Sequence, residues 1–122
     1  MAISFTEENY LKVIHRLSEA TSEDISTNAV AELMQTKAAS VTDMLRKLAE
    51  KGWVNYQKYQ GVRLSVEGEK IALSIVRKHR LWEVFLVDKM GFNWDEVHEI
   101  AEQLEHIESD QLINKLDEYL GF

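Results

Sequence analysis

The chain has 122 residues, of which 45% are hydrophobic and 29% charged, a composition typical of a globular protein with its own core. No apolar run approaches the roughly 18 residues that a membrane helix needs, and the first ten residues, MAISFTEENY, do not read as a signal peptide. The chain has no cysteine, which excludes a disulfide framework and a thiolate metal site and fits a cytoplasmic protein.

Apolar spacing in the first fifty residues predicts three helices. The segment TEENYLKVIHRLSEA forms the first, with Thr6 as its expected N-cap, and TNAVAELMQ forms a short second helix. The third is TKAASVTDMLRKLAEKG, which Gly52 is placed to end. The inward faces predicted for the three helices are, in order, Tyr10, Val13, Ile14 and Leu17; Val30, Leu33 and Met34; and Val41, Met44, Leu45 and Leu48.

The pattern changes to a period of two in WVNYQKYQGVRLSVEG. One strand is predicted around Val54 and a second around Val62, with YQG as the turn between them. Three helices followed by a two-stranded hairpin predict a winged helix-turn-helix, with MQTKAA as the turn that joins the second and third helices. We assign residues 1–72 to this DNA-binding domain.

The remainder of the chain predicts only helices, so the fold class is mostly α. Ser65 is placed to cap a long helix that runs to about Lys89, and Gly91 closes it. Asn93 and Glu96 predict a capping box for the next helix, and Ser109 begins a last one that ends near Gly121. Residues 73–122 therefore form a second, helical domain.

The net charge of −7 conceals two segments of opposite charge. Residues 37–63 carry a net charge of +4, whereas residues 92–122 carry −8. A local basic patch suits DNA, and the third helix of the motif would enter a major groove. The candidate DNA-contact residues are Thr27, Asn28, Thr36, Lys37, Ala38, Ala39, Ser40, Thr42, Asp43, Arg46, Lys47, Lys58 and Arg63.

The acidic segment contains VHEIAEQLEHIES, which places metal-ligand side chains on one helix face. At about 100° per residue, His98, Glu102, Glu105 and His106 fall within roughly a third of the circumference. His79 and Glu83 lie one turn apart on the preceding helix. Imidazole and carboxylate ligands without sulfur suit Mn(II) or Fe(II). No zinc-protease motif, Gly-rich phosphate loop or Ser/His/Asp set is present, so we do not predict an enzyme.

These segments together resemble a known family. RKHRLWEVFL followed by VHEIAEQLEHIESD, behind LMQTKAASVTDMLRKL, resembles the diphtheria-toxin-repressor family of metal-dependent transcriptional regulators. The resemblance covers nearly the whole chain and is closest to the manganese-responsive branch. It implies a transcriptional repressor of metal-ion homeostasis that binds a palindromic operator as a homodimer, with Mn(II) or Fe(II) as corepressor.

The resemblance also implies two metal sites. Glu102, Glu105 and His106 match the regulatory site, and Asn9 stands where the family supplies a further ligand from its first helix. The second, ancillary site is matched by His79, Glu83 and His98. The chain departs from the manganese branch at Lys12, which cannot act as a ligand while charged. The apolar residues expected on the dimer surface are Trp82, Phe85, Leu86, Met90 and Phe92, with Leu112, Leu116 and Leu120 nearby.

Two alternatives remain from the residues alone. The chain could be a winged-helix regulator that senses no metal, with the acidic helix merely solvated. It could also be a helical metal-binding protein or metalloenzyme without a role on DNA, in which case the basic segment 37–63 would have no purpose.

Overall fold

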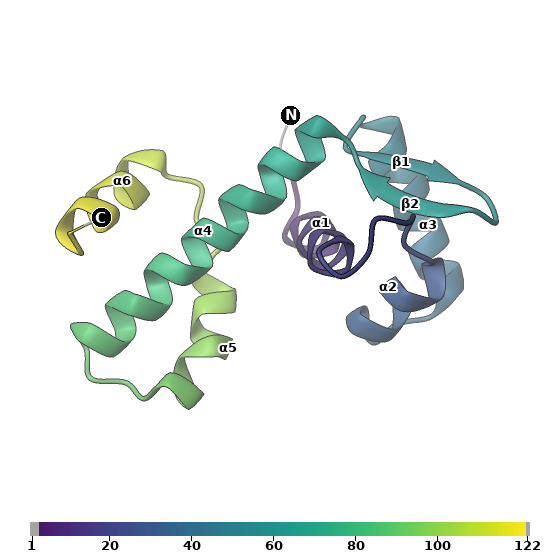
Figure 1. Cartoon of the computed structure of the whole chain (residues 1–122). Helices are drawn as coiled ribbons and strands as arrows, with labels where there is room; N and C mark the ends of the chain where they lie inside the picture. The colour runs from purple at the N-terminus through teal and green to yellow at the C-terminus, as the bar shows by residue number, and fades with distance from the viewer. Residues whose placement is uncertain (1–2, 122) are drawn as a thin grey trace. The chain divides into compact units, whose positions relative to one another are not determined.

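The computed structural model describes residues 3–121 and confirms the mostly α fold. Its elements are α1 (Phe5–Ser18), α2 (Thr27–Met34), α3 (Ala38–Glu50), β1 (Val54–Gln57), β2 (Gly61–Leu64), α4 (Val66–Asp88), α5 (Trp94–Leu104) and α6 (Asp110–Tyr119) (Figure 1). The chain divides into two compact units, Met1–Leu73 and Ser74–Phe122. None of the helices in residues 3–121 is long and apolar enough to cross a membrane.

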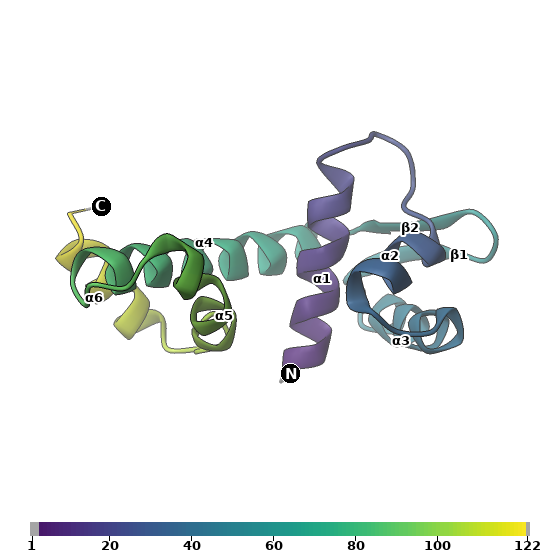
Figure 2. The same ribbon diagram turned by 90° about the horizontal axis from the view of Figure 1, so that it is seen from below.

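The first unit is a winged helix-turn-helix. Helix α2 packs against both α1 and α3, while the hairpin contacts α3 through β1 and α1 through β2 (Figures 1 and 2). Its core includes side chains with no exposed area, namely Leu11, Ile14, Val30, Val41, Leu45, Leu48 and Val62. These residues come from all three helices and from β2, so burial of one shared apolar surface fixes the arrangement of the motif.

The hairpin β1–β2 is antiparallel, with Val54 opposite Leu64 and Gln57 opposite Gly61. The segment before α2 joins this small sheet, because Ile25 and Val62 exchange two backbone hydrogen bonds of 2.8 Å. Gly61 permits the approach, since a Cβ atom there would lie 2.6 Å from the carbonyl oxygen of Ile25. The predicted wing is thus confirmed, and it is anchored to the start of the helix-turn-helix.

One predicted N-cap was wrong. The N-cap of α1 is Ser4, not Thr6: the Ser4 hydroxyl accepts from the Glu7 N–H, and the Glu7 carboxylate accepts from the Ser4 N–H. A glutamate three residues after Ser4 completes a capping box, an advantage that Thr6 lacks. Helix starts were predicted correctly after Ser65, Asn93 and Ser109.

The second unit has its own apolar core between α4, α5 and α6. Its buried members are Trp82, Ala101, Ile113 and Leu116, and Phe85, Leu104 and Leu120 are among the half-buried residues packed against them. Trp82 and Phe85 meet edge to face, with ring centroids 5.8 Å apart. The unit therefore holds together through side chains contributed by all three helices.

Two predictions about apolar faces were wrong. Leu33, predicted to face inward on α2, is 40% exposed, because Val30 and Ala31 occupy the buried side of this short helix. Trp82 and Leu86, predicted on a dimer surface, are buried within one chain, although Met90 of the same set is exposed. The spacing of apolar residues along a helix predicts which face is apolar, but not which element packs against that face.

Candidate metal centre

His79 on α4 lies among carboxylates that come from α4 and from the turn after α5. Its Nε2 atom is 3.3 Å from Oε2 of Glu83, one helical turn later. Its Nδ1 atom is 3.0 Å from Oε2 of Glu105. Both ring nitrogens of one imidazole therefore face a carboxylate oxygen, an arrangement that fixes the orientation of the ring.

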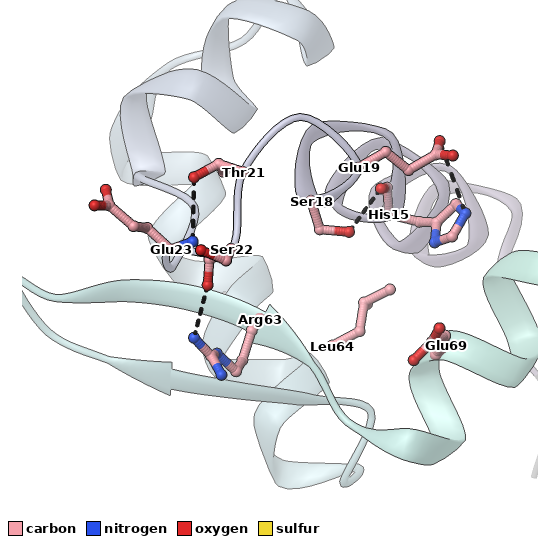
Figure 3. A pocket seen from close by; sticks show the side chains of 9 residues that line it. All are labelled: His15, Ser18, Glu19, Thr21, Ser22, Glu23, Arg63, Leu64 and Glu69. Carbon is pink, nitrogen blue, oxygen red and sulfur yellow. Dashed lines mark hydrogen bonds and ion pairs between the residues drawn. The ribbon is translucent and has the colours of Figure 1, made fainter.

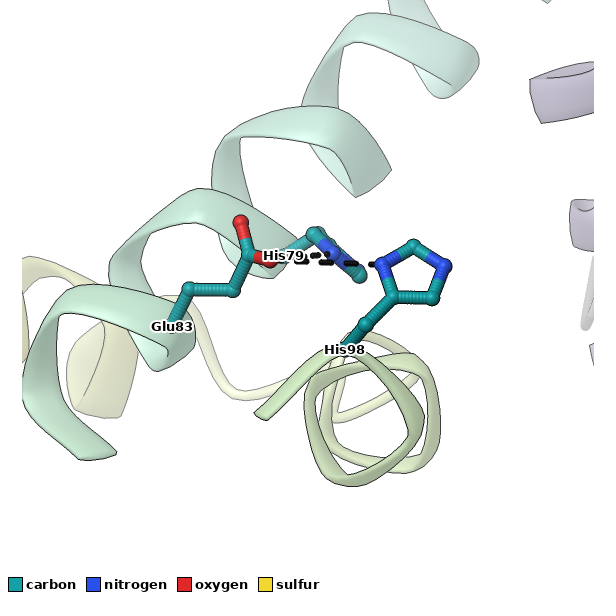
Figure 4. Close-up of side chains that lie close together, drawn as sticks. All are labelled: His79, Glu83 and His98. Carbon is teal, nitrogen blue, oxygen red and sulfur yellow. Dashed lines mark ion pairs between the residues drawn. The ribbon is translucent and has the colours of Figure 1, made fainter. Parts of the chain in front are cut away.

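His98 on α5 completes a compact group with His79 and Glu83 (Figure 4). Its Nδ1 atom lies 4.0 Å from the same Glu83 oxygen, and its ring meets the His79 ring with centroids 4.9 Å apart. One ligand atom from each of the three residues lies within 4.8 Å of the others. The His98 side chain is 65% exposed, so this group opens to solvent on one side.

Glu105 and His106 lie in the interior of the second unit. Glu105 is fully buried and His106 nearly so, and His106 Nε2 is 3.9 Å from Glu105 Oε1. A buried carboxylate is costly unless it is hydrogen-bonded or paired with a cation. The single carboxylate of Glu105 thus faces two imidazoles, those of His79 and His106.

Glu102 lies nearer the surface than Glu105. Its Oε1 atom is 3.3 Å from Nε2 of His98, one turn earlier on α5. The Glu102 side chain is 45% exposed. Glu102, which the resemblance assigns to the regulatory site, therefore pairs with His98, a member of the predicted ancillary set.

Helical spacing explains the two contacts within single helices, but not the contacts between them. The pairs His79–Glu83 and His98–Glu102 are each four residues apart, which places their side chains on one face of α4 and α5 respectively. Helix α5 ends at Leu104, however, and the Ile107 N–H donates to the Leu104 carbonyl to tighten the last turn. The predicted helical face therefore ends before Glu105, the C-cap of α5, and His106, which follows it.

The donors of this group suit a divalent cation. Six side chains supply imidazole nitrogen and carboxylate oxygen, and these residues are His79, Glu83, His98, Glu102, Glu105 and His106. Neighbouring donor atoms lie 3.0–4.0 Å apart, close enough for small side-chain movements to place them around one ion or two. Asn9 lies in the first unit, and its role as a ligand stays a prediction.

The predicted DNA-contact residues all lie in the first unit. Most are exposed, including the run from Thr36 to Ser40 and the pair Arg46 and Lys47 on α3, whereas Thr27 and Thr42 are half-buried. Lys58 lies at the tip of the hairpin and is exposed. The surface that the motif would turn toward a duplex is thus available in this unit.

Arg63 differs from the other predicted contacts because its guanidinium is already paired. Its Nε donates to Asp24 at 2.6 Å, and a second nitrogen reaches the Ser22 carbonyl at 3.5 Å, beside a hollow that Ser18, Thr21 and Glu69 also line (Figure 3). Asp24 was not predicted, and no sequence signal marks it, since 39 positions separate it from Arg63.

Comparison with known proteins supports both units. Residues 3–62 match the N-terminal DNA-binding domain of iron-dependent repressors, and residues 65–122 match the metal-binding and dimerisation domain of the same family. A solved structure of a manganese-dependent transcriptional repressor in complex with manganese is 43% identical, with a TM-score of 0.85 over 95% of this chain and 53% of that one.

Related protein sequences are also transcriptional regulators. An uncharacterised HTH-type transcriptional regulator of Methanocaldococcus jannaschii is 35% identical over 89% of this chain and 87% of its own length. The regulator MntR of Oceanobacillus iheyensis is 30% identical over 94% and 77%. The chain spans only about half of the diphtheria toxin repressor of Corynebacterium jeikeium, which is also 30% identical, over 93% of this chain and 49% of that protein.

The two halves of the chain thus match successive domains of one family, in the same order and over nearly every residue. That family comprises transcriptional repressors and not enzymes, in agreement with the prediction. The chain belongs to the iron-dependent repressor family, the metal-dependent DNA-binding regulators that include the diphtheria toxin repressor.

Proposed function

We propose that this protein is a homodimeric repressor that binds a palindromic operator when Mn(II) or Fe(II) is bound. The observation that carries the proposal is the position of His79, whose two ring nitrogens face carboxylates of α4 and of the turn after α5. In this proposal residues 1–72 bind DNA, and residues 73–122 bind metal and form the dimer. A repressor of this kind works where the chromosome is, so we place it in the cytoplasm.

The electrostatics of the group support metal dependence. Glu83, Glu102 and Glu105 lie on neighbouring parts of one unit, and each faces at least one imidazole within 3.3 Å. A bound divalent cation would supply positive charge that favours three carboxylates remaining ionised close together. The histidines of the group would then contribute neutral nitrogens, and the glutamates would contribute charged oxygens.

The donor set supports Mn(II) and Fe(II) over more thiophilic metals. Every proposed ligand of this unit offers oxygen or nitrogen, and the chain has no cysteine. Hard oxygen ligands suit Mn(II), whereas thiolate ligands favour later metals, although Zn(II) can still bind more tightly by the general order of affinities. The relative that is described in complex with manganese is consistent with this choice.

Charge and exposure support double-stranded DNA as the partner. Exposed basic side chains lie at the N-cap of α3 (Lys37), on its later turns (Arg46 and Lys47) and at the tip of the hairpin (Lys58). Lys and Arg contacts with phosphates release counterions, so we expect the affinity to fall steeply with salt. Two-fold symmetry of a dimer would require two half-sites at a fixed spacing.

The test is a gel-shift titration of the protein on duplexes selected from genomic fragments, with Mn(II) and with chelator. We expect at least a tenfold increase in affinity with Mn(II), a coupling of about 1.4 kcal/mol. Glu105→Ala should abolish that increase while the chain stays folded and dimeric. Glu99→Ala is the matched control, because Glu99 is exposed on α5 and outside the group.

The outcomes separate the alternatives. Equal binding with and without metal would identify a winged-helix regulator that does not sense metal. Metal binding by calorimetry without binding to any duplex would identify a metal-binding protein with no role on DNA.

A further inference from the structure

The tip of the hairpin presents an aromatic side chain to solvent. Tyr59 is 93% exposed and lies between β1 and β2, in the turn Gln57–Gln60 that is closed by a hydrogen bond from the Gln60 N–H to the Gln57 carbonyl. Because it is so exposed, the Tyr59 ring contributes almost nothing to the core of the unit. Its presence therefore calls for an explanation other than packing.

The backbone of Tyr59 makes that choice of residue more unusual. Its φ is +68°, in the left-handed region, at the third position of the turn. Glycine or asparagine ordinarily takes this position, because a larger side chain is strained there. Strained residues that persist at a surface tend to mark functional sites. A tyrosine at this position is therefore a candidate for direct contact with a partner.

The surroundings of the ring indicate the chemistry of that partner. The Lys58 Nζ atom lies over the Tyr59 ring, 5.1 Å from its centroid. The hairpin and its flanks, residues 53–64, contain Lys58 and Arg63 and no acidic residue, and Arg63 is paired with Asp24 outside this range. An ammonium group, a phenolic hydroxyl and an exposed ring face are together suited to a phosphate, an adjacent sugar and the edge of a groove.

We propose that Tyr59 is a DNA-backbone contact of the wing. In this contact the hydroxyl donates to a phosphate, the ring packs on the neighbouring deoxyribose, and Lys58 approaches the same or the next phosphate. The contact is independent of base sequence, so it supports affinity for any duplex that the helix-turn-helix selects. This inference rests on the proposed DNA-binding function.

The test uses the full chain with Mn(II) and a fluorescein-labelled duplex that the parent protein has selected from a random-sequence library. Tyr59→Gly should lower the affinity for this duplex about tenfold, the effect of losing both hydroxyl and ring contacts. Tyr59→Phe should show a smaller loss, because it keeps the ring. Tyr59→Gly should also melt no lower than the parent, because glycine relieves the left-handed backbone.

Salt dependence distinguishes the two neighbouring side chains. Lys58→Gln should reduce the slope of log affinity against log salt by about one, whereas neither Tyr59 variant should change it, because tyrosine is neutral. Gln60→Gly is the matched control: it adds a glycine to the same turn, keeps the backbone N–H and leaves Tyr59 in place, and it should bind like the parent.

The outcomes keep this inference separate from the proposed function. If the parent protein selects no duplex with Mn(II), the proposed function is wrong, and the proposed Tyr59 contact with DNA is wrong as well. If the parent binds and Tyr59→Gly binds equally well, only the contact is wrong. A loss confined to one sequence variant of the duplex would overturn the backbone contact in favour of base recognition.

Discussion

The Nδ1 atom of His79 lies 3.0 Å from Oε2 of the fully buried Glu105, a residue 26 positions later in the chain. The same ring faces Glu83 through Nε2. His79 therefore links a residue that the family resemblance assigns to the ancillary site with one assigned to the regulatory site. This contact connects the two predicted sites. It supports our proposal that the six imidazole and carboxylate side chains of the second unit form one metal-binding group.

We predict that His79→Ala weakens Mn(II) binding at least tenfold, as the loss of a ligand or of a partner that orients one commonly does. It should also destabilise the metal-depleted protein by about 1–3 kcal/mol, because Glu105 loses a hydrogen bond in a buried position. Calorimetric Mn(II) titration and thermal melting measure the two effects. His15→Ala is the control, since His15 belongs to the first unit and pairs only weakly, at 3.9 Å, with Glu19. Parent-like Mn(II) affinity in His79→Ala would contradict the proposed centre.

A change at Glu102 should alter metal preference without destroying metal binding. Glu102→Cys replaces a hard oxygen with a thiolate, so we predict that activation of DNA binding shifts from Mn(II) toward Fe(II), Co(II) or Ni(II). The measurement is DNA affinity across a titration of each metal, under anaerobic conditions for Fe(II). Glu99→Cys adds a thiol at an exposed position of the same helix and should leave the preference unchanged. A parent protein that responds to Fe(II) but not to Mn(II) would refute the premise of this prediction.

Glu7 makes the stability of the first unit depend on pH. Burial alone raises the pKa of the Glu7 carboxyl, but hydrogen bonds from Lys51 and Ser4 and the Lys51 charge outweigh it, so the pKa lies below its ordinary 4.5. The unfolded chain therefore binds this proton more readily than the folded chain. The Glu7 contribution to stability is complete above the ordinary pKa and is lost as the pH falls through the lower, folded value.

We predict accordingly that Lys51→Met destabilises the protein by about 1–3 kcal/mol at pH 7, because it leaves a buried carboxylate with one partner fewer. The difference from the parent should shrink as the pH falls below the ordinary pKa of the carboxyl. Thermal melts across this range measure it. Lys70→Met is the control, because Lys70 and Glu67 are both exposed and 3.8 Å apart, a pair expected to contribute little. A deficit that is constant with pH would mean that the loss comes from the Lys51 contact with the Trp53 ring.

Gly68 is required where α4 begins. A Cβ atom at this position would overlap the backbone carbonyl oxygen of Trp53. Backbone atoms held by neighbouring hydrogen bonds cannot move aside cheaply, so Gly68→Ala should destabilise the first unit by about 1–3 kcal/mol or more, despite the higher helix propensity of alanine. Denaturant unfolding measures the loss. Glu69→Ala, at an exposed position in the same turn, is the control and should be nearly neutral. A neutral Gly68→Ala would show that the start of α4 can move away from the Trp53 backbone.

Local signals in the sequence determined most of the secondary structure. The capping residues Ser65 and Ser109 and the alternation around Val54 and Val62 act over a few residues, so they can be read without knowledge of the fold. The paired spacings His79–Glu83 and His98–Glu102 are local in the same sense, because a helix places residues four apart on one face.

Only the tertiary structure decided which local faces meet. The contact between His79 and Glu105 depends on how α5 ends and packs against α4, and the helical period does not contain that information. The same holds for Trp82 and Leu116, whose apolar character was evident but whose partners turned out to lie in their own unit. It holds also for Asp24, which meets Arg63 because a loop joins the wing. Sequence patterns specify which surfaces must be buried, whereas the three-dimensional packing of whole elements determines the partner that buries each one.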